Sequence, residues 1–183
     1  MDILSVLKEE HRTVSAMLDE VTQCEPGDER LDELAGIIEK ELTTHAMLEE
    51  RLFYPELRDR AEEVDERVDV FEAYTEHELV KHLIALLKSG RKRDELFKAE
   101  LQVLGESVKH HVREEESTIF AMARELLDRE ELDELGERWQ AAKSRLTPGT
   151  SSNGRRTRKK ASATQRGGSK ARAGSRKKTA RKR

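Results

Sequence analysis

Two segments of the sequence repeat one pattern, a histidine followed after three residues by two glutamates and, two residues later, by an apolar pair. The first copy is HAMLEERLFY, beginning at His45, and the second is HVREEESTIF, beginning at His111. Residues four apart share one face of a helix, so His45 lies beside Glu49 and His111 beside Glu115. We interpret the two copies as halves of one metal site. Any fold of this chain must therefore bring the two segments together.

The composition favours an all-α body. Hydrophobic residues make up 35% of the 183 residues and charged residues 40%, as is usual for helices with one solvated face. Apolar residues spaced three and four apart predict four long helices and one short helix. The expected ranges are about 2–24, 28 into the 50s, 64–89, 94–127 and 129–146. We expect Pro55 to kink or end the second helix, and the short fifth helix to pack across the bundle as a cap.

Each long helix carries one histidine in the middle of its apolar stripe, at His11, His45, His77 and His111. A lone histidine in such a place is usually a hydrogen-bonded core residue. Four of them, together with two in-register glutamates, form a different case because a buried carboxylate is costly without compensation. A cation compensates all of them. Imidazole and carboxylate suit iron, manganese and zinc, whereas a thiolate zinc site lacks ligands because Cys24 is the only cysteine.

The other two histidines lie off these stripes. His110 precedes His111 and points about 100° away from it on a regular helix. His82 follows His77 by five residues, about 140° round the helix. His82 reaches the site only if the third helix contains a local bulge, a feature known at functional sites. We expect Tyr54 and Tyr74, which lie near the site, to be packing residues.

These residues resemble the hemerythrin-like proteins with HHE cation-binding domains. The resemblance covers about residues 2–127, and the motifs that carry it are EEHR at 9–12, HAMLEERLFYP at 45–55, EHELVKH at 76–82 and HHVREEESTIF at 110–120. It implies an up-down four-helix bundle with a carboxylate-bridged pair of non-haem irons. The implied ligands are His11 and His45 on one iron, His77 and His111 on the other, and Glu49 and Glu115 as bridges.

One departure from the family pattern concerns the third helix. The oxygen-carrying members have a third histidine on the second iron, supplied by a close pair on that helix, and here an extra residue separates His77 from His82. The resemblance further implies that the site binds oxygen or a related small species such as peroxide or nitric oxide, or senses iron. Whether it carries, senses or turns over its ligand stays open, because no acid or base is placed distinctively enough for a catalytic cycle.

Charge divides the chain into two parts. Residues 1–146 hold 21 Lys and Arg against 38 Asp and Glu, a net charge of −17, whereas residues 147–183 hold 14 Lys and Arg and no acidic residue. The second part has no large apolar residue and begins with the linker-like run TPGTSSNG. We therefore predict a helical domain over 1–146 and a disordered basic tail over 147–183.

A flexible polycation without acidic or aromatic residues suits contacts with phosphates, so nucleic acid is the expected partner of the tail. An anionic membrane is the runner-up, and a third interpretation is an arm that neutralises the acidic body. The alternative function for the whole chain is a nucleic-acid-associated protein whose helical body has a minor metal role or none. The start of the sequence has no basic region followed by a long apolar run, and no segment approaches the roughly 18 apolar residues of a membrane span. We expect a soluble cytoplasmic protein.

Overall fold

The computed structural model describes residues 1–88 and 92–146. Within these ranges all regular structure is helical, which confirms the predicted all-α fold with four long rods and a short fifth helix. Two rods are each interrupted by a π-helical turn. In chain order the elements are α1 (Ile3–Gln23), α2 (Glu29–Leu48), the π turn η1 (Glu49–Phe53), α3 (Tyr54–Arg60), α4 (Val64–Leu87), α5 (Glu95–Glu114), the π turn η2 (Glu115–Ile119), α6 (Phe120–Leu126) and α7 (Arg129–Leu146). The first rod is α1, the second comprises α2, η1 and α3, the third is α4, and the fourth comprises α5, η2 and α6.

Acidic caps set where the long helices begin. The side chain of Asp2 accepts a hydrogen bond from the Ser5 amide, and Asp28 and Asp94 act in the same way at the starts of α2 and α5. Glu63 forms a reciprocal capping box with Glu66 at the start of α4. These carboxylates accept hydrogen bonds from amides that have no partner within the helix, and their negative charge interacts favourably with the positive end of the helix dipole.

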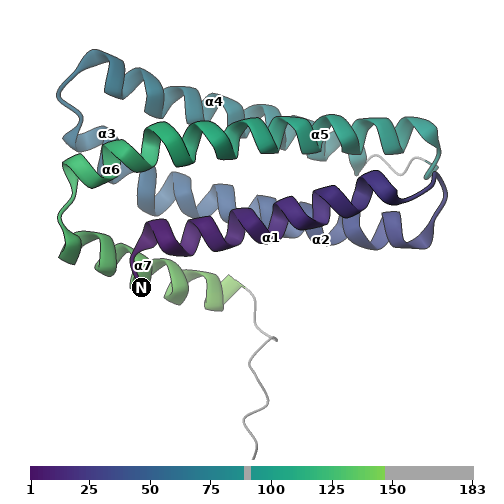
Figure 1. Ribbon diagram of the computed structural model, residues 1–183, viewed down its shortest axis with the longest axis horizontal. Coiled ribbons are helices and arrows are strands. Elements are labelled where there is room, and N and C mark those ends of the chain that lie inside the picture. The colour runs from purple at the N-terminus through teal and green to yellow at the C-terminus, as the bar shows by residue number, and fades with distance from the viewer. Residues whose placement is uncertain (89–91, 147–183) are drawn as a thin grey trace, which may run out of the picture. The chain divides into compact units, whose positions relative to one another are not determined.

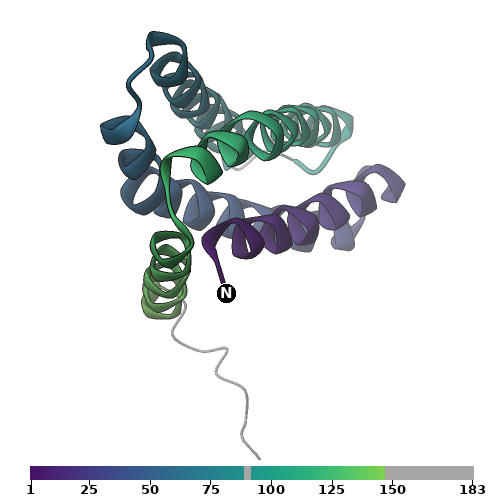
Figure 2. The same ribbon diagram turned by 60° about the vertical axis from the view of Figure 1, so that its left-hand side comes forward.

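The rods run alternately up and down, as Figure 1 shows. Packing contacts join α1 to α2, α2 to α4, α4 to α5 and α5 to α1, so the rods form a closed ring in that order. Helix α7 contacts α1, α2 and η1, and it lies on the side of α1 away from α4 and α5 (Figures 1 and 2). It therefore covers the flank of the bundle that α1 and α2 form.

The core consists of two apolar clusters separated along the bundle. In α1 the buried apolar residues before His11 belong to one cluster, and those after it belong to the other. The fourth rod divides in the same way, because its apolar residues up to Val108 lie in one cluster and those from Ile119 onward lie in the other. The polar residues of the candidate site thus occupy a layer between two hydrophobic cores, which hold the rods together on both sides of it.

The second rod does not end at Pro55, which was one of the two outcomes predicted there. Although α2 ends at Leu48, the helical path continues through Pro55 to Arg60. In the π turn η1 the Tyr54 amide donates to the Glu49 carbonyl, five residues back, and Pro55 then falls in the first turn of α3. A proline is tolerated there because the first-turn amides need no partner within the helix.

None of the helices within the described ranges combines the length and the apolar character that a membrane crossing requires. The predicted basic tail at 147–183, including its predicted disorder, lies outside the described residues, and so does Gly90 at the predicted end of the third helix.

We predict that Gly136→Ala destabilises the fold, because α7 meets the start of the chain at this glycine. A Cβ atom at Gly136 would collide with the backbone carbonyl of Met1 and lie 3.1 Å from the Ile3 amide nitrogen. We expect a loss of about 1–3 kcal/mol in the free energy of unfolding, measured by chemical denaturation. Gly36→Ala is the matched control, since nothing lies within 4 Å of a Cβ there. It should add about 0.5–1 kcal/mol through helix propensity alone. Equal effects of the two changes would contradict the packing of α7 described above.

Candidate metal centre

Six polar side chains meet in the layer between the two cores, and they are the buried polar or charged residues among those that the structure describes. Their exposed fractions range from 0% for Glu49 to 8% for His45. The histidines come from the four rods, and each glutamate opens a π turn. The set comprises His11, His45, Glu49, His77, His111 and Glu115. The structure therefore brings together all six residues that the sequence nominated as metal ligands.

The four imidazoles form two pairs whose Nε2 atoms face each other. The distance between the Nε2 atoms is 3.1 Å for His11 and His45 and 3.2 Å for His77 and His111. Glu49 spans the two pairs, because its Oε1 lies 2.9 Å from Nε2 of His45 and its Oε2 lies 3.2 Å from Nε2 of His77. One carboxylate thus connects both halves of the cluster through its two oxygens.

Glu115 enters the cluster in a different way. Its Oε2 lies 3.1 Å from Nε2 of His11 and 3.8 Å from Nε2 of His111, whereas its Oε1 accepts a hydrogen bond of 3.1 Å from the Tyr54 hydroxyl. Burial, reinforced by the charges of Glu115 and Glu49, raises the pKa of Tyr54 well above its usual value, so the hydroxyl stays a donor. The expectation that Tyr54 only packs was therefore wrong. Tyr74 packs against the Tyr54 ring at 5.2 Å, as expected.

A second layer of carboxylates surrounds the histidines, and the sequence analysis did not identify it. The Nδ1 atom of every histidine in the cluster forms a hydrogen bond with a glutamate of a neighbouring rod. The pairs are His45 with Glu10 (3.0 Å), His77 with Glu50 (2.9 Å), His111 with Glu76 (2.8 Å) and His11 with Glu116 (3.1 Å). These four outer carboxylates follow the ring α1, α2, α4, α5 and back to α1, so each rod orients the histidine of the next.

Such outer carboxylates hold an imidazole with Nε2 directed at a common centre, and they make that nitrogen a stronger ligand. Hydrogen bonds from His77 and His111 lower the pKa values of Glu50 and Glu76, which keeps both groups ionised at neutral pH. Two local features of the sequence pointed to these residues. Glu10 and Glu76 each directly precede a histidine of the cluster, and Glu50 and Glu116 are the second members of the Glu-Glu pairs.

The π turns place consecutive glutamates in two different roles. Glu49 points into the cluster while Glu50 reaches His77 on α4, and Glu115 and Glu116 divide in the same manner between the cluster and His11 on α1. In each turn the amide five residues on donates to the carbonyl of the inner glutamate. The bulge considered for the third helix is absent, because α4 is α-helical throughout Val64–Leu87. The π turns lie instead in the second and fourth rods, at the glutamates.

Neither His82 nor His110 joins the cluster. Helix α4 is a regular α-helix over Val64–Leu87, and His82 is exposed on its surface. The side chain of His110 is 57% exposed and its Nε2 lies 3.3 Å from Oε1 of Glu76. The prediction that His110 points away from the cluster is therefore confirmed.

The cluster has the chemistry of a cation site. Both carboxylate oxygens of Glu49 and Oε2 of Glu115 are buried and accept no hydrogen bond of good geometry, although ring nitrogens lie close by. Buried charged oxygens in this state are costly unless something else compensates them. Two groups of ligand atoms lie close enough to hold an ion. One comprises His11, His45, Glu49 and Glu115, and the other comprises Glu49, His77 and His111. A nitrogen and carboxylate set of this kind fits iron, manganese or zinc.

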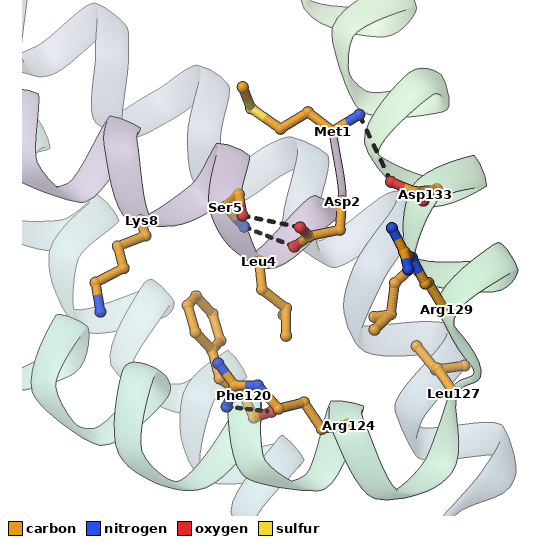
Figure 3. A pocket seen from close by; sticks show the side chains of 11 residues that line it. Met1, Asp2, Leu4, Ser5, Lys8, Phe120, Arg124, Leu127, Arg129 and Asp133 are labelled. Carbon is orange, nitrogen blue, oxygen red and sulfur yellow. Dashed lines mark hydrogen bonds and ion pairs between the residues drawn. The ribbon is translucent and has the colours of Figure 1, made fainter.

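A larger pocket lies elsewhere. It has a volume of about 770 Å³ and lies between the start of α1, α6 and the start of α7 (Figure 3). Phe120 lines this pocket and stacks on His11 with ring centroids 6.0 Å apart, so it separates the pocket from the cluster. The pocket contains none of the six buried polar residues.

Comparisons with known proteins agree with this geometry. The family model described as the hemerythrin HHE cation binding domain matches residues 2–123. The crystal structure of a hemerythrin HHE cation binding domain-containing protein from Mycobacterium kansasii is similar in fold, with a TM-score of 0.69 and 23% sequence identity, over 79% of this chain and 86% of that one. A DNA nickase from a Nostoc species is 33% identical over 146 residues, which are 80% of this chain but only 40% of the nickase.

We predict that the metal-free protein loses stability between about pH 6.5 and pH 10. Burial alone would lower the pKa values of His45 and His77, but the nearby carboxylates of Glu10, Glu49 and Glu50 raise them to about 10 and about 9. A raised pKa stabilises the fold fully below the ordinary value of 6.5, and this contribution disappears as the pH rises through the folded-state value. Thermal denaturation of the metal-free protein should therefore show a falling midpoint over this interval.

The matched variants for this measurement are His77→Asn, which should reduce the fall, and His82→Asn, which should not. Added metal should release protons from the cluster and weaken the pH dependence, because metal ions compete with protons for the same nitrogens. A melting midpoint that stays constant or rises from pH 6.5 to pH 10 would contradict the raised pKa values of His45 and His77.

Proposed function

Since this chain belongs to the hemerythrin HHE cation-binding domain family, we propose that its helical body is a non-haem di-iron protein. His11 and His45 bind one iron and His77 and His111 bind the other, with Glu49 and Glu115 as the carboxylates between them. The observation that carries the proposal is the set of buried carboxylate oxygens without a hydrogen-bond partner, which lie between two facing pairs of imidazoles.

The ligand set accepts several metals, and membership of the hemerythrin HHE family favours iron among them. Imidazole and carboxylate together suit Fe, Mn and Zn, and two such centres joined by carboxylates are the arrangement of di-iron bundles. When bound, iron supplies reactivity toward oxygen, peroxide or nitric oxide at coordination positions that protein ligands leave open. The protein orients four imidazoles through the outer carboxylates and holds Glu115 through the Tyr54 hydroxyl. Together with the two apolar clusters, these contacts keep the site rigid and largely shielded from water.

The resulting function is the binding of oxygen or a related small species, or the sensing of iron. A cycle of anaerobic reduction and addition of oxygen, peroxide or nitric oxide, followed by visible absorption, distinguishes the ligands. Reversible spectral changes identify a carrier or sensor, whereas consumption of many equivalents of peroxide identifies turnover.

We predict that Glu49→Gln/Glu115→Gln abolishes iron binding. The parent protein should contain about two irons per chain by elemental analysis, and the variant should contain almost none because neutral amides replace both buried carboxylates. Chelation of the parent should lower its melting temperature, since a ligand that binds only the native state stabilises it. Glu125→Gln/Glu137→Gln, a change of equal charge at exposed positions, should leave the iron content intact. An iron-free parent, or melting that chelation leaves unchanged, would refute the proposal.

A second candidate function, association with nucleic acid, is favoured by two observations. Residues 147–183 concentrate 14 positive charges after a body of net charge −17. In addition, the relative from Nostoc is named a DNA nickase, although this chain matches only 40% of it. A basic segment of this composition contacts phosphates without reading bases. We propose that it holds the di-iron body near DNA or RNA, where the body intercepts oxidants.

We predict that truncation after Leu146 abolishes nucleic-acid binding and leaves the iron content unchanged. Binding of the full chain to duplex DNA should weaken with salt, with a slope of about −0.9 for each phosphate neutralised. A control of equal length, with the basic residues of RRTRKK at 155–160 changed to glutamine, should bind at intermediate strength. If the truncated body binds equally well, or the full chain fails to bind at low salt, an arm that neutralises the acidic body is the better explanation.

A further inference from the structure

Each pair of neighbouring rods forms one flank of the metal centre, and each flank contains one outer carboxylate. The four flanks differ in the side chain that is paired with this carboxylate. Three of the four outer carboxylates are paired with a lysine ammonium, namely Glu10 with Lys143 (3.1 Å), Glu50 with Lys81 (2.8 Å) and Glu116 with Lys8 (3.3 Å). The fourth, Glu76, is paired with the imidazole of His110 instead. Among the residues that the structure describes, no lysine pairs with the outer carboxylate at the flank between α4 and α5.

A pocket of about 140 Å³ opens at this flank. Its wall includes His111 and Glu115 of the cluster, so the pocket reaches the metal centre itself. The remaining lining is strongly acidic, and within residues 1–88 and 92–146 no lysine or arginine contributes to it. The acidic residues that line it outside the cluster are Asp69, Glu72, Glu76 and Glu114.

The inner end of this acidic pocket includes Glu115, whose Oε2 lies 3.1 Å from Nε2 of His11 but accepts no hydrogen bond of good geometry from the described residues. Glu115 is 1% exposed, and its Oε1 is occupied by Tyr54. The acidic residues thus lead from the surface to a buried charged oxygen that a cation would compensate.

The larger pocket near the cluster has a mixed lining, with three basic and two acidic side chains. The basic residues Lys8, Arg124 and Arg129 line it together with Asp2, Asp133 and Phe120 (Figure 3). The ring of Phe120 also stacks on His11. A cation approaching there meets a lining in which positive side chains outnumber negative ones, and the ring of Phe120 lies against His11.

We propose that divalent iron enters the bundle through the acidic pocket between α4 and α5, and this proposal rests on the di-iron function above. Glu72 and Glu114 at the exposed rim attract the ion, and Asp69 and Glu76 pass it inward to His111 and Glu115. A cleft lined by one sign of charge with low-dielectric walls concentrates counter-ions and raises their rate of entry. The lysines on the other three flanks make those routes unfavourable for a cation.

The test uses metal-free full-length protein mixed with Fe²⁺ under anaerobic conditions. Uptake can be followed by fluorescence, because the only tryptophan, Trp139, has its ring 5.5 Å from that of His45. Glu72→Gln/Glu114→Gln should slow uptake about tenfold at low salt, and much less at about 1 M salt, where charges are screened over about 3 Å. The final iron content should equal that of the parent. The matched control, Glu25→Gln/Glu137→Gln, removes two exposed carboxylates elsewhere and should load at the parent rate.

A second pair of variants tests the same entrance by adding charge. His110→Lys gives this flank the ammonium that the other flanks have and should also slow uptake, whereas His82→Lys makes the same change on the exposed face of α4 and should not. If Glu72→Gln/Glu114→Gln and His110→Lys take up iron as fast as their control variants, the proposal that iron enters through this pocket is wrong. A fall in final iron content in Glu72→Gln/Glu114→Gln also overturns it, because these groups would then be ligands. A parent chain that takes up no iron refutes the proposed function itself.

Discussion

The approach of four imidazoles to two buried carboxylates is the interaction on which the rest of the structure depends. Glu49 and Glu115 are almost fully buried, and each brings a negative charge into a helical core. Removing a carboxylate from water is unfavourable unless close partners compensate it. The facing histidine pairs supply those partners, one histidine from each of the four rods. The position of every rod is therefore fixed by a contact between its histidine and a buried carboxylate.

Two devices make this arrangement possible. The π turns at Glu49–Phe53 and Glu115–Ile119 allow adjacent glutamates to serve the cluster and a neighbouring histidine, respectively. The two apolar clusters on either side of the polar layer supply the hydrophobic stabilisation that a charged layer lacks. The bundle thus places its most polar residues where the rods are held on both sides, and the site gains rigidity from the surrounding core.

Charge is arranged in shells around the centre. The inner carboxylates are surrounded by the imidazoles, and the imidazoles by the outer carboxylates. On three flanks a lysine forms an ion pair with the outer carboxylate. Each shell fixes the one inside it, because a histidine held at Nδ1 presents Nε2 in one direction. On the fourth flank Glu76 is paired with His110 instead of a lysine, and the acidic pocket lies there. The contacts of the outer carboxylates therefore also distinguish this flank from the other three.

The sequence by itself determined the elements that depend on local periodicity. Apolar stripes located the helices, and the i, i+4 spacing of His45 and Glu49 nominated a buried site. Only the tertiary structure decided which glutamate of one rod meets which histidine of the next, that Tyr54 belongs to the site, and that His82 does not. The reason is physical: helical periodicity fixes the face that a residue occupies, whereas contacts between rods depend on their packing and on π turns that shift the register after each glutamate.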